Sequence, residues 1–113
     1  MHEFFVVQNI IRTVEEIIEN YPNKKITKAV FLIGKFSGIE VELLKNALDF
    51  FKKETPLEEA EIVFEIEDLK IKCLNCGAET IKDKWNLICS SCGSANTEVI
   101  AGEELILKTL ELV

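Results

Sequence analysis

The sequence has little of the positive charge that recognises nucleic acids. Arg12 is its only arginine, and 20 acidic residues outnumber 13 lysines and arginines, which gives a formal net charge of -7. Tight binding to a phosphate backbone needs clustered basic side chains. A local group of lysines, Lys70, Lys72, Lys82 and Lys84, is better interpreted as a solvated face or a surface for an acidic protein. The charge balance therefore argues against a nucleic-acid partner.

Long apolar runs are also absent. No stretch approaches the length that crosses a bilayer. The start, Met1-His2-Glu3, has neither the basic segment nor the cleavage site of a signal peptide, because an amphipathic stretch follows it at once. We therefore expect no membrane association and a cytoplasmic protein, in which thiols stay reduced.

Groups that commonly serve catalysis are scarce. His2 is the only histidine, and the sequence has no glycine-rich loop of the kind that holds phosphates. Adjacent carboxylates such as Glu15 and Glu16 do not face each other on a helix, so they are expected to lie on solvated surface. The sequence therefore predicts a protein that is not an enzyme.

Hydrophobic periodicity predicts two helices and three strands. Helices are expected over residues 4–21 and from about 39 to 53, and strands over 26–33, 61–67 and 105–113. Ser37 followed by Glu40 has the spacing of a capping box at the start of the second helix. Alternation in 61–67 predicts a strand that buries the face bearing Ile62, Phe64 and Ile66.

All four cysteines form two closely spaced pairs. The segments Cys73-Leu-Asn-Cys76-Gly77 and Cys89-Ser-Ser-Cys92-Gly93 are separated by twelve residues. Two residues between cysteines let both sulfurs of a turn point at one ion, and the glycine permits a positive φ. Four thiolates suit a structural, coordinatively full zinc site, while iron remains chemically open and disulfides or a redox dithiol are weaker alternatives.

The resulting fold class is α+β. We expect a three-stranded mixed sheet covered by two helices, because 26–67 is long enough for a parallel crossover. Residues 1–67 and 103–113 would form one domain, and 68–102 an inserted zinc-ribbon-like lobe. Beyond Trp85, Leu87 and Ile88 the lobe has few large apolar residues, so a metal is expected to hold it together. The joining strands, near Asp68-Leu69 and Ala101-Gly102, could act as a hinge.

The first residues suggest a second metal site. A terminal amine at Met1, the His2 amide and the His2 imidazole can close adjacent chelate rings. The fourth planar donor could be the amide or carboxylate of Glu3, or a group of another residue. Nitrogen-rich planar sites favour Ni(II) or Cu(II). The positive end of the following helix opposes a cation there, unless the Glu3 carboxylate offsets its field.

These motifs together resemble the HypA-type nickel metallochaperones of hydrogenase and urease maturation. The likeness covers nearly the whole chain and rests on Met1-His2-Glu3, both cysteine turns, and the segments 33–39, 55–60 and 102–105. It implies Ni(II) as transient cargo on Met1, His2 and Glu3, and structural Zn(II) on Cys73, Cys76, Cys89 and Cys92. At Glu103 the family often has arginine, which reverses a surface charge.

The resemblance also implies a role and partners. Nickel would pass to the large subunit of a nickel–iron hydrogenase, together with a HypB-type GTPase, and urease maturation proteins are a second possible destination. Read from the cysteines alone, the alternative is a zinc-ribbon module that binds nucleic acid or the transcription apparatus. The sparse arginine and the acidic balance oppose that alternative.

Overall fold

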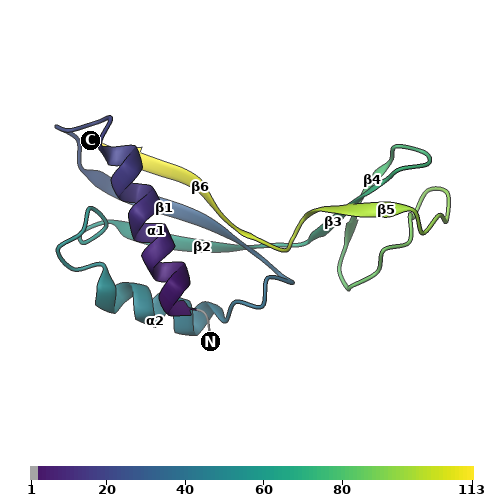
Figure 1. The fold of residues 1–113 in the computed structure, drawn as a ribbon, viewed down its shortest axis with the longest axis horizontal. Helices are drawn as coiled ribbons and strands as arrows, with labels where there is room; N and C mark the ends of the chain where they lie inside the picture. Colours follow the sequence, from purple (N-terminus) through teal and green to yellow (C-terminus); the bar gives the residue numbers. More distant parts are fainter. Residues whose placement is uncertain (1–2) are drawn as a thin grey trace. The chain divides into compact units, whose positions relative to one another are not determined.

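The computed structural model describes residues 3–113 and contains two helices and six strands within that range (Figure 1). In chain order they are α1 (Glu3–Ile18), β1 (Ile26–Gly34), α2 (Val41–Phe51), β2 (Glu61–Glu67), β3 (Leu69–Cys73), β4 (Glu79–Lys82), β5 (Thr97–Ala101) and β6 (Leu105–Leu112). The chain divides into two compact units. The first comprises residues up to 31, 39–64 and 107–113, and the second comprises 32–38 and 65–106. The domain boundaries expected from the sequence stay a prediction.

The first unit buries one stripe of α1. Val7, Ile10 and Val14 are buried at the spacing of one helix face. The helix is shorter than the predicted 4–21, because Asn20 and Tyr21 donate their amides to the carbonyls of Ile17 and Ile18, three residues back, and tighten the chain into a turn.

Within the described range no helix is both long and apolar enough to cross a bilayer.

The helical spacing of apolar residues predicts that Phe4 of α1 and Leu43 and Phe51 of α2 face the core, but all three are largely exposed. Phe4 is 48% exposed, and on α2 Leu43 and Phe51 are 51% and 41% exposed. Phe4 and Phe51 pack on each other instead, with ring centroids 5.3 Å apart where α1 meets α2. Only Leu44 and Leu48 of α2 are fully buried, so the buried face of this helix is narrow.

The start of α2 also corrects the sequence prediction. Glu40 is the N-cap, its side chain makes no capping bond, and the helix begins at Val41. Ser37 therefore cannot cap it, since Gly38 adopts a φ of 77° and turns the chain before the helix starts. At the other end α2 stops at Phe51, two residues before the predicted end.

The larger sheet has the order β2-β1-β6 and is mixed, as predicted. Lys25 and Val113 exchange both backbone hydrogen bonds, which makes β1 and β6 antiparallel. The amide of Lys35 donates to the carbonyl of Glu67, so β1 and β2 end at the same side of the sheet and run parallel. The predicted fold class, α+β with two helices and this sheet, is confirmed.

The expectation that β2 has a well-buried face is wrong. Ile62 and Phe64 are half-buried and Ile66 is 55% exposed. β2 lies at an edge of the sheet, where it has a neighbour on one side only. Phe64 nevertheless packs on the buried ring of Phe31, with centroids 5.7 Å apart.

The second unit contains a small antiparallel sheet that the sequence did not predict. Its order is β4-β3-β5, with β3 in the centre. Ile71 lies opposite Thr80 and Val99, and it is buried together with Leu69. Trp85 and Ile88, the apolar residues noted in the sequence, are 51% and 45% exposed. The buried leucine and isoleucine of the lobe, Leu69 and Ile71, therefore both lie in β3.

Backbones approach closely where β6 begins. Gly102 has a φ of 104°, and a Cβ on it would meet the Cα of Leu69 at 2.7 Å. A Cβ on Gly34 would meet the carbonyl carbon and oxygen of Gly102 at 2.3 Å. Side chains at these two positions would collide with backbone atoms, so glycine is required there for packing.

Candidate metal centre

The four cysteines lie on two backbone turns of similar geometry in the second unit. Cys73 is the last residue of β3, and Gly77 donates its amide to the Cys73 carbonyl at 3.0 Å. The second turn repeats this bond, from Gly93 to Cys89, at 2.9 Å. Gly77 and Gly93 have φ angles of 79° and 77°, the left-handed conformation that the sequence predicted for them.

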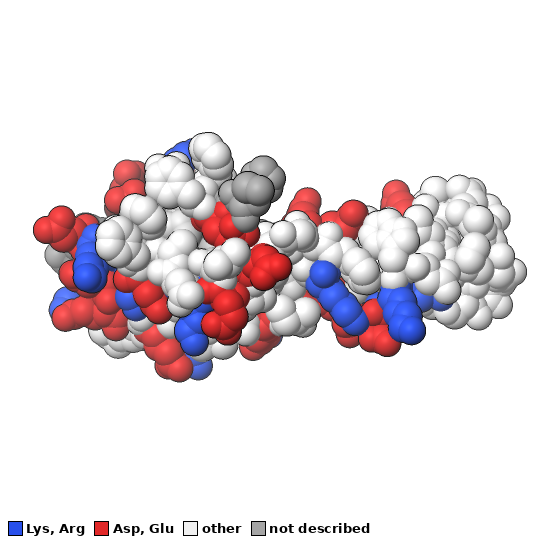
Figure 2. All heavy atoms as spheres, turned by 90° about the horizontal axis from the view of Figure 1, so that it is seen from below, with Lys and Arg blue, Asp and Glu red and all other residues white. Residues whose placement is uncertain are grey.

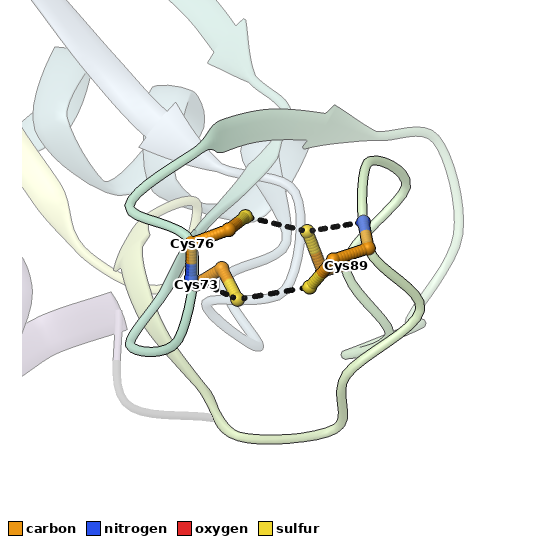
Figure 3. Close-up of side chains that lie close together, drawn as sticks. Cys73, Cys76 and Cys89 are labelled. Carbon is orange, nitrogen blue, oxygen red and sulfur yellow. Dashed lines mark hydrogen bonds between the residues drawn. The ribbon is translucent and has the colours of Figure 1, made fainter.

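The turns bring the four sulfurs into one group (Figure 3). Cys73 Sγ lies 3.6 Å from Cys92 Sγ, and Cys76 Sγ lies 3.7 Å from Cys89 Sγ, so each close pair joins the two turns. All four sulfurs lie within 4.8 Å of one another. In a tetrahedral zinc site with Zn–S bonds of about 2.3 Å, neighbouring sulfurs are about 3.8 Å apart. The donors therefore fit one tetrahedral metal ion.

Disulfide bonds, one of the alternatives considered from the sequence, do not form here. All four cysteines are free thiols, and the cross-turn sulfur distances far exceed the bond length of about 2.0 Å. Cys73 and Cys89 are buried, while Cys76 and Cys92 are exposed. The sulfur group thus has a buried side within the lobe and a side that faces solvent.

Backbone amides point at the buried sulfurs. Cys73 Sγ accepts from the amide of Cys76 at 3.4 Å, and this bond is the main cause that lowers the pKa of Cys73. Cys89 Sγ accepts from the amides of Cys92 and Ser91 at 3.5 and 3.4 Å. These bonds, that of Cys92 foremost, lower the pKa of Cys89 to about 6. Both thiols are thereby prepared to bind a cation as thiolates.

Cys92 differs from the two buried thiols. The amide of Ser94 acts to lower its pKa, but the neighbouring Cys73 sulfur, burial and the other two sulfurs outweigh this and raise the pKa to about 12. Several thiolates in one place repel one another. A bound divalent cation supplies the opposite charge that allows all of them to ionise.

The two turns carry no charged side chains of their own. Residues 73–78 and 85–97 contain no aspartate, glutamate, lysine or arginine. The face in Figure 2 shows the same contrast, because the end of the lobe lacks the coloured charged groups found elsewhere. Two of the neighbouring lysines bind within the lobe: Lys70 pairs with Glu79 at 3.1 Å, and Lys82 donates to Ser90 Oγ at 2.7 Å.

The predicted nickel ligands are only partly covered by the structure. Met1 and His2 lie outside the described residues. Glu3 is the first residue of α1 and is 9% exposed. A carboxylate in the first turn lies at the positive end of the helix dipole, which it stabilises.

Sequence reasoning missed two groups of contacts in the second unit. Asn75, Ser94 and Asn96 join the two cysteine turns through side-chain hydrogen bonds. Lys35 Nζ donates to the carbonyl and a carboxylate oxygen of Asp83 at 2.6 and 3.0 Å. Beside this pair the ring of Phe36 meets Trp85 edge-on, with centroids 5.4 Å apart. No sequence pattern signals such contacts, since the partners are far apart in the chain.

Known proteins resemble this chain over its whole length. Residues 1–112 match the family described as "Hydrogenase/urease nickel incorporation, metallochaperone, hypA". The hydrogenase maturation factor HypA of Aquifex aeolicus is 46% identical over 112 residues, covering 99% of this chain and 97% of that protein. HypA of Shewanella halifaxensis is 37% identical over 112 residues, covering 99% and 97%.

Solved structures agree with these sequence relatives. The solution structure of the Ni metallochaperone HypA from Helicobacter pylori superposes with a TM-score of 0.77 at 27% identity, covering 100% of this chain and 98% of that one. A second HypA solution structure gives a TM-score of 0.71 at 28% identity, covering 100% and 97%. Together with the cysteine geometry, these matches establish that the chain belongs to the HypA family of nickel metallochaperones, which are hydrogenase maturation factors and not enzymes.

Proposed function

We propose that this protein binds Ni(II) at its N-terminus and delivers it to the large subunit of a nickel–iron hydrogenase, while Cys73, Cys76, Cys89 and Cys92 hold a structural Zn(II). The observation that carries the proposal is a complete four-thiolate group in a chain of the nickel metallochaperone family. A coordinatively full site leaves no open position for cargo. Nickel must then bind elsewhere, and the first three residues offer the nitrogen-rich donors.

Zinc is the proposed resident metal because of the donor set and the surroundings. The sulfur separations of 3.6 and 3.7 Å suit zinc. Amide hydrogen bonds to Cys73 and Cys89 are partners that orient and stabilise thiolate ligands. When bound, zinc would tie β3 to the loop of the second turn and contribute on the order of 10 kcal/mol to folding the lobe. Iron has the same preference for four thiolates, and metal analysis of protein grown without added zinc separates the two.

The nickel site is proposed at the Met1 amine, the His2 amide and imidazole, and Glu3. These donors form adjacent chelate rings that suit planar Ni(II). The place of Glu3 in the first turn of α1 supports the proposal, because its carboxylate offsets the field of the helix dipole on a nearby cation. Donors at a chain end, which lose their protons near neutral pH, allow the ion to be released again.

Partners follow from the same proposal. Family members act in hydrogenase maturation, so we infer contacts with a HypB-type GTPase and with the hydrogenase large subunit, in the cytoplasm. Urease maturation proteins are the second class of client, since the family description names both enzymes. Pull-down of tagged client subunits in the presence and absence of nickel distinguishes them.

The zinc-ribbon alternative, a module that binds nucleic acid or the transcription apparatus, finds little support. The cysteine turns offer no lysine or arginine to a phosphate backbone within 73–78 and 85–97. A net charge of -7 adds a long-range repulsion. A mobility-shift assay at moderate salt should show no retardation of DNA or RNA.

The decisive test compares three forms of the zinc-loaded protein by calorimetric nickel titration. These are the native chain, His2→Ala, and a chain extended by two residues before Met1. The extension keeps every side chain but removes the free amine from Met1. Loss of nickel binding in both altered forms supports the proposed chelate. Unchanged binding in either form removes that donor and refutes the site.

A further inference from the structure

The geometry of the sulfur group depends on how far apart the two cysteine turns lie. Each close sulfur pair joins one turn to the other: Cys73 to Cys92, and Cys76 to Cys89. A contact that holds the two turns at the right separation therefore keeps the four sulfurs ready for a metal ion, even if it never touches the metal.

Three neutral side chains make such contacts. Asn75, between the cysteines of the first turn, donates from Nδ2 to Ser94 Oγ at 2.7 Å. Its Oδ1 accepts from Asn96 Nδ2 at 3.1 Å. Ser94 Oγ also accepts the amide of Asn96 at 3.0 Å, so the three side chains form one connected network.

The network is attached to the backbone of both turns. The amide of Leu74, in the first turn, donates to the carbonyl of Asn96 at 2.8 Å. The amide of Cys89, in the second turn, donates to the carbonyl of Ser94 at 2.8 Å. Neither segment has a charged side chain, so these neutral amide and hydroxyl bonds, together with the pairing of Cys73 with Thr97 between β3 and β5, join the two turns.

We propose that Asn75, Ser94 and Asn96 are positioning residues that hold the two cysteine turns at metal-binding distance and slow the release of zinc. The proposal rests on the proposed zinc site. Zinc leaves only when the turns separate, and separation breaks both bonds of the Asn75 amide. Ordering the turns during folding also lowers the cost of metal binding, which is the usual benefit of preorganisation.

The expected effect follows from the number of bonds removed. Asn75→Ala loses two side-chain hydrogen bonds between the turns and should release zinc about tenfold faster. Ser94→Ala loses only one bond between the turns, because the Asn96 amide that it also accepts lies in its own segment, and should release zinc about fivefold faster. The double variant, Asn75→Ala with Ser94→Ala, should release zinc at most about twofold faster than Asn75→Ala alone. The reason is that both changes remove the same bond between Asn75 and Ser94. Ser94→Thr keeps the hydroxyl and should behave as the native chain.

The experiment measures zinc release from the full zinc-loaded chain into excess colorimetric chelator. Asn86→Ala is the matched control, because Asn86 Oδ1 also accepts a backbone amide, that of Ile88 at 2.9 Å, but within one loop only. A second readout is the visible spectrum of the Co(II)-substituted protein. The spectrum should be unchanged in every variant, since the four thiolate ligands remain.

The proposal is supported if Asn75→Ala and Ser94→Ala release zinc faster than the native chain. Asn86→Ala and Ser94→Thr must at the same time release zinc at the native rate. Release within about twofold of native from Asn75→Ala overturns it, and so does an equal acceleration by Asn86→Ala, which would reflect general loosening of the lobe. If the Co(II)-substituted native chain gave a spectrum without the features of four thiolate ligands, the zinc site itself would be refuted. The two failures are therefore distinguishable.

Discussion

Alanine substitution of three glycines separates backbone strain from close packing in the second unit. Gly38 has a φ of 77° with no atom within 4 Å of the place that a methyl group would occupy, so alanine there adds strain alone. Alanine at Gly34 adds a steric clash alone, because its Cβ would lie 2.3 Å from the carbonyl of Gly102. Alanine at Gly102 adds both strain and a clash, because the residue has a φ of 104° and its Cβ would lie 2.7 Å from the Cα of Leu69.

These contacts set the expected order of destabilisation. A left-handed alanine costs about 1 kcal/mol in Gly38→Ala. Collision with backbone atoms that cannot rotate away costs about 3 kcal/mol in Gly34→Ala. Gly102→Ala combines the two and should cost roughly 4 kcal/mol. At about 4 °C per kcal/mol for a chain of this size, the melting temperature should fall by about 4, 12 and 16 °C respectively.

The assays are urea unfolding and thermal unfolding of zinc-loaded protein. Both are followed by the fluorescence of Trp85, the only tryptophan, and by far-ultraviolet circular dichroism. Elemental analysis must show equal zinc in every sample, so that metal loss does not imitate a packing defect. If Gly34→Ala and Gly102→Ala were no more destabilising than Gly38→Ala, the close backbone approach would be refuted.

Three further outcomes are expected. Phe36→Ala should shift the fluorescence emission of Trp85, because an edge-on aromatic contact is lost. The unfolding free energy in the same urea assay should fall by about 1 kcal/mol. An unchanged emission spectrum would contradict the contact. Cys73→Ser should weaken zinc binding by more than the roughly 100-fold typical of outer-shell changes, since it removes a buried side chain that is proposed as a ligand. Chelator competition measures the zinc affinity, and an unchanged affinity would remove Cys73 from the proposed site. Nickel affinity should rise from about pH 6 to 9, because the proposed donors, the His2 imidazole and the Met1 amine, must lose protons whose pKa values are near 6.5 and 8 in free peptides. A nickel affinity that does not change with pH would exclude both donors.

Much of the fold could be predicted because the signals are local. The spacing of Val7, Ile10 and Val14 marks the buried face of α1, and the strands β1, β2 and β6 begin within a residue of their predicted starts. The cysteine site was predictable for the same reason. The spacing within each turn and the glycine that follows determine the turn conformation, which the structure confirms.

The missed features depend on contacts between distant residues. The start of α2 moved because Gly38 turns the chain, which the Ser37–Glu40 spacing does not reveal. The small sheet of the lobe has short strands, and β3 meets β5 with an irregular register between Lys70 and Ile71, so no clean alternation marks it. Asn75 and Ser94 are nineteen residues apart, and their bond exists only once the two turns have come together.

The assignment of the two metals to different donors can be measured directly by X-ray absorption on protein loaded with one zinc and one nickel. The account predicts four sulfur neighbours at the zinc edge and only nitrogen and oxygen neighbours at the nickel edge. Sulfur scattering around nickel would show that the cysteines carry the cargo and would contradict the account.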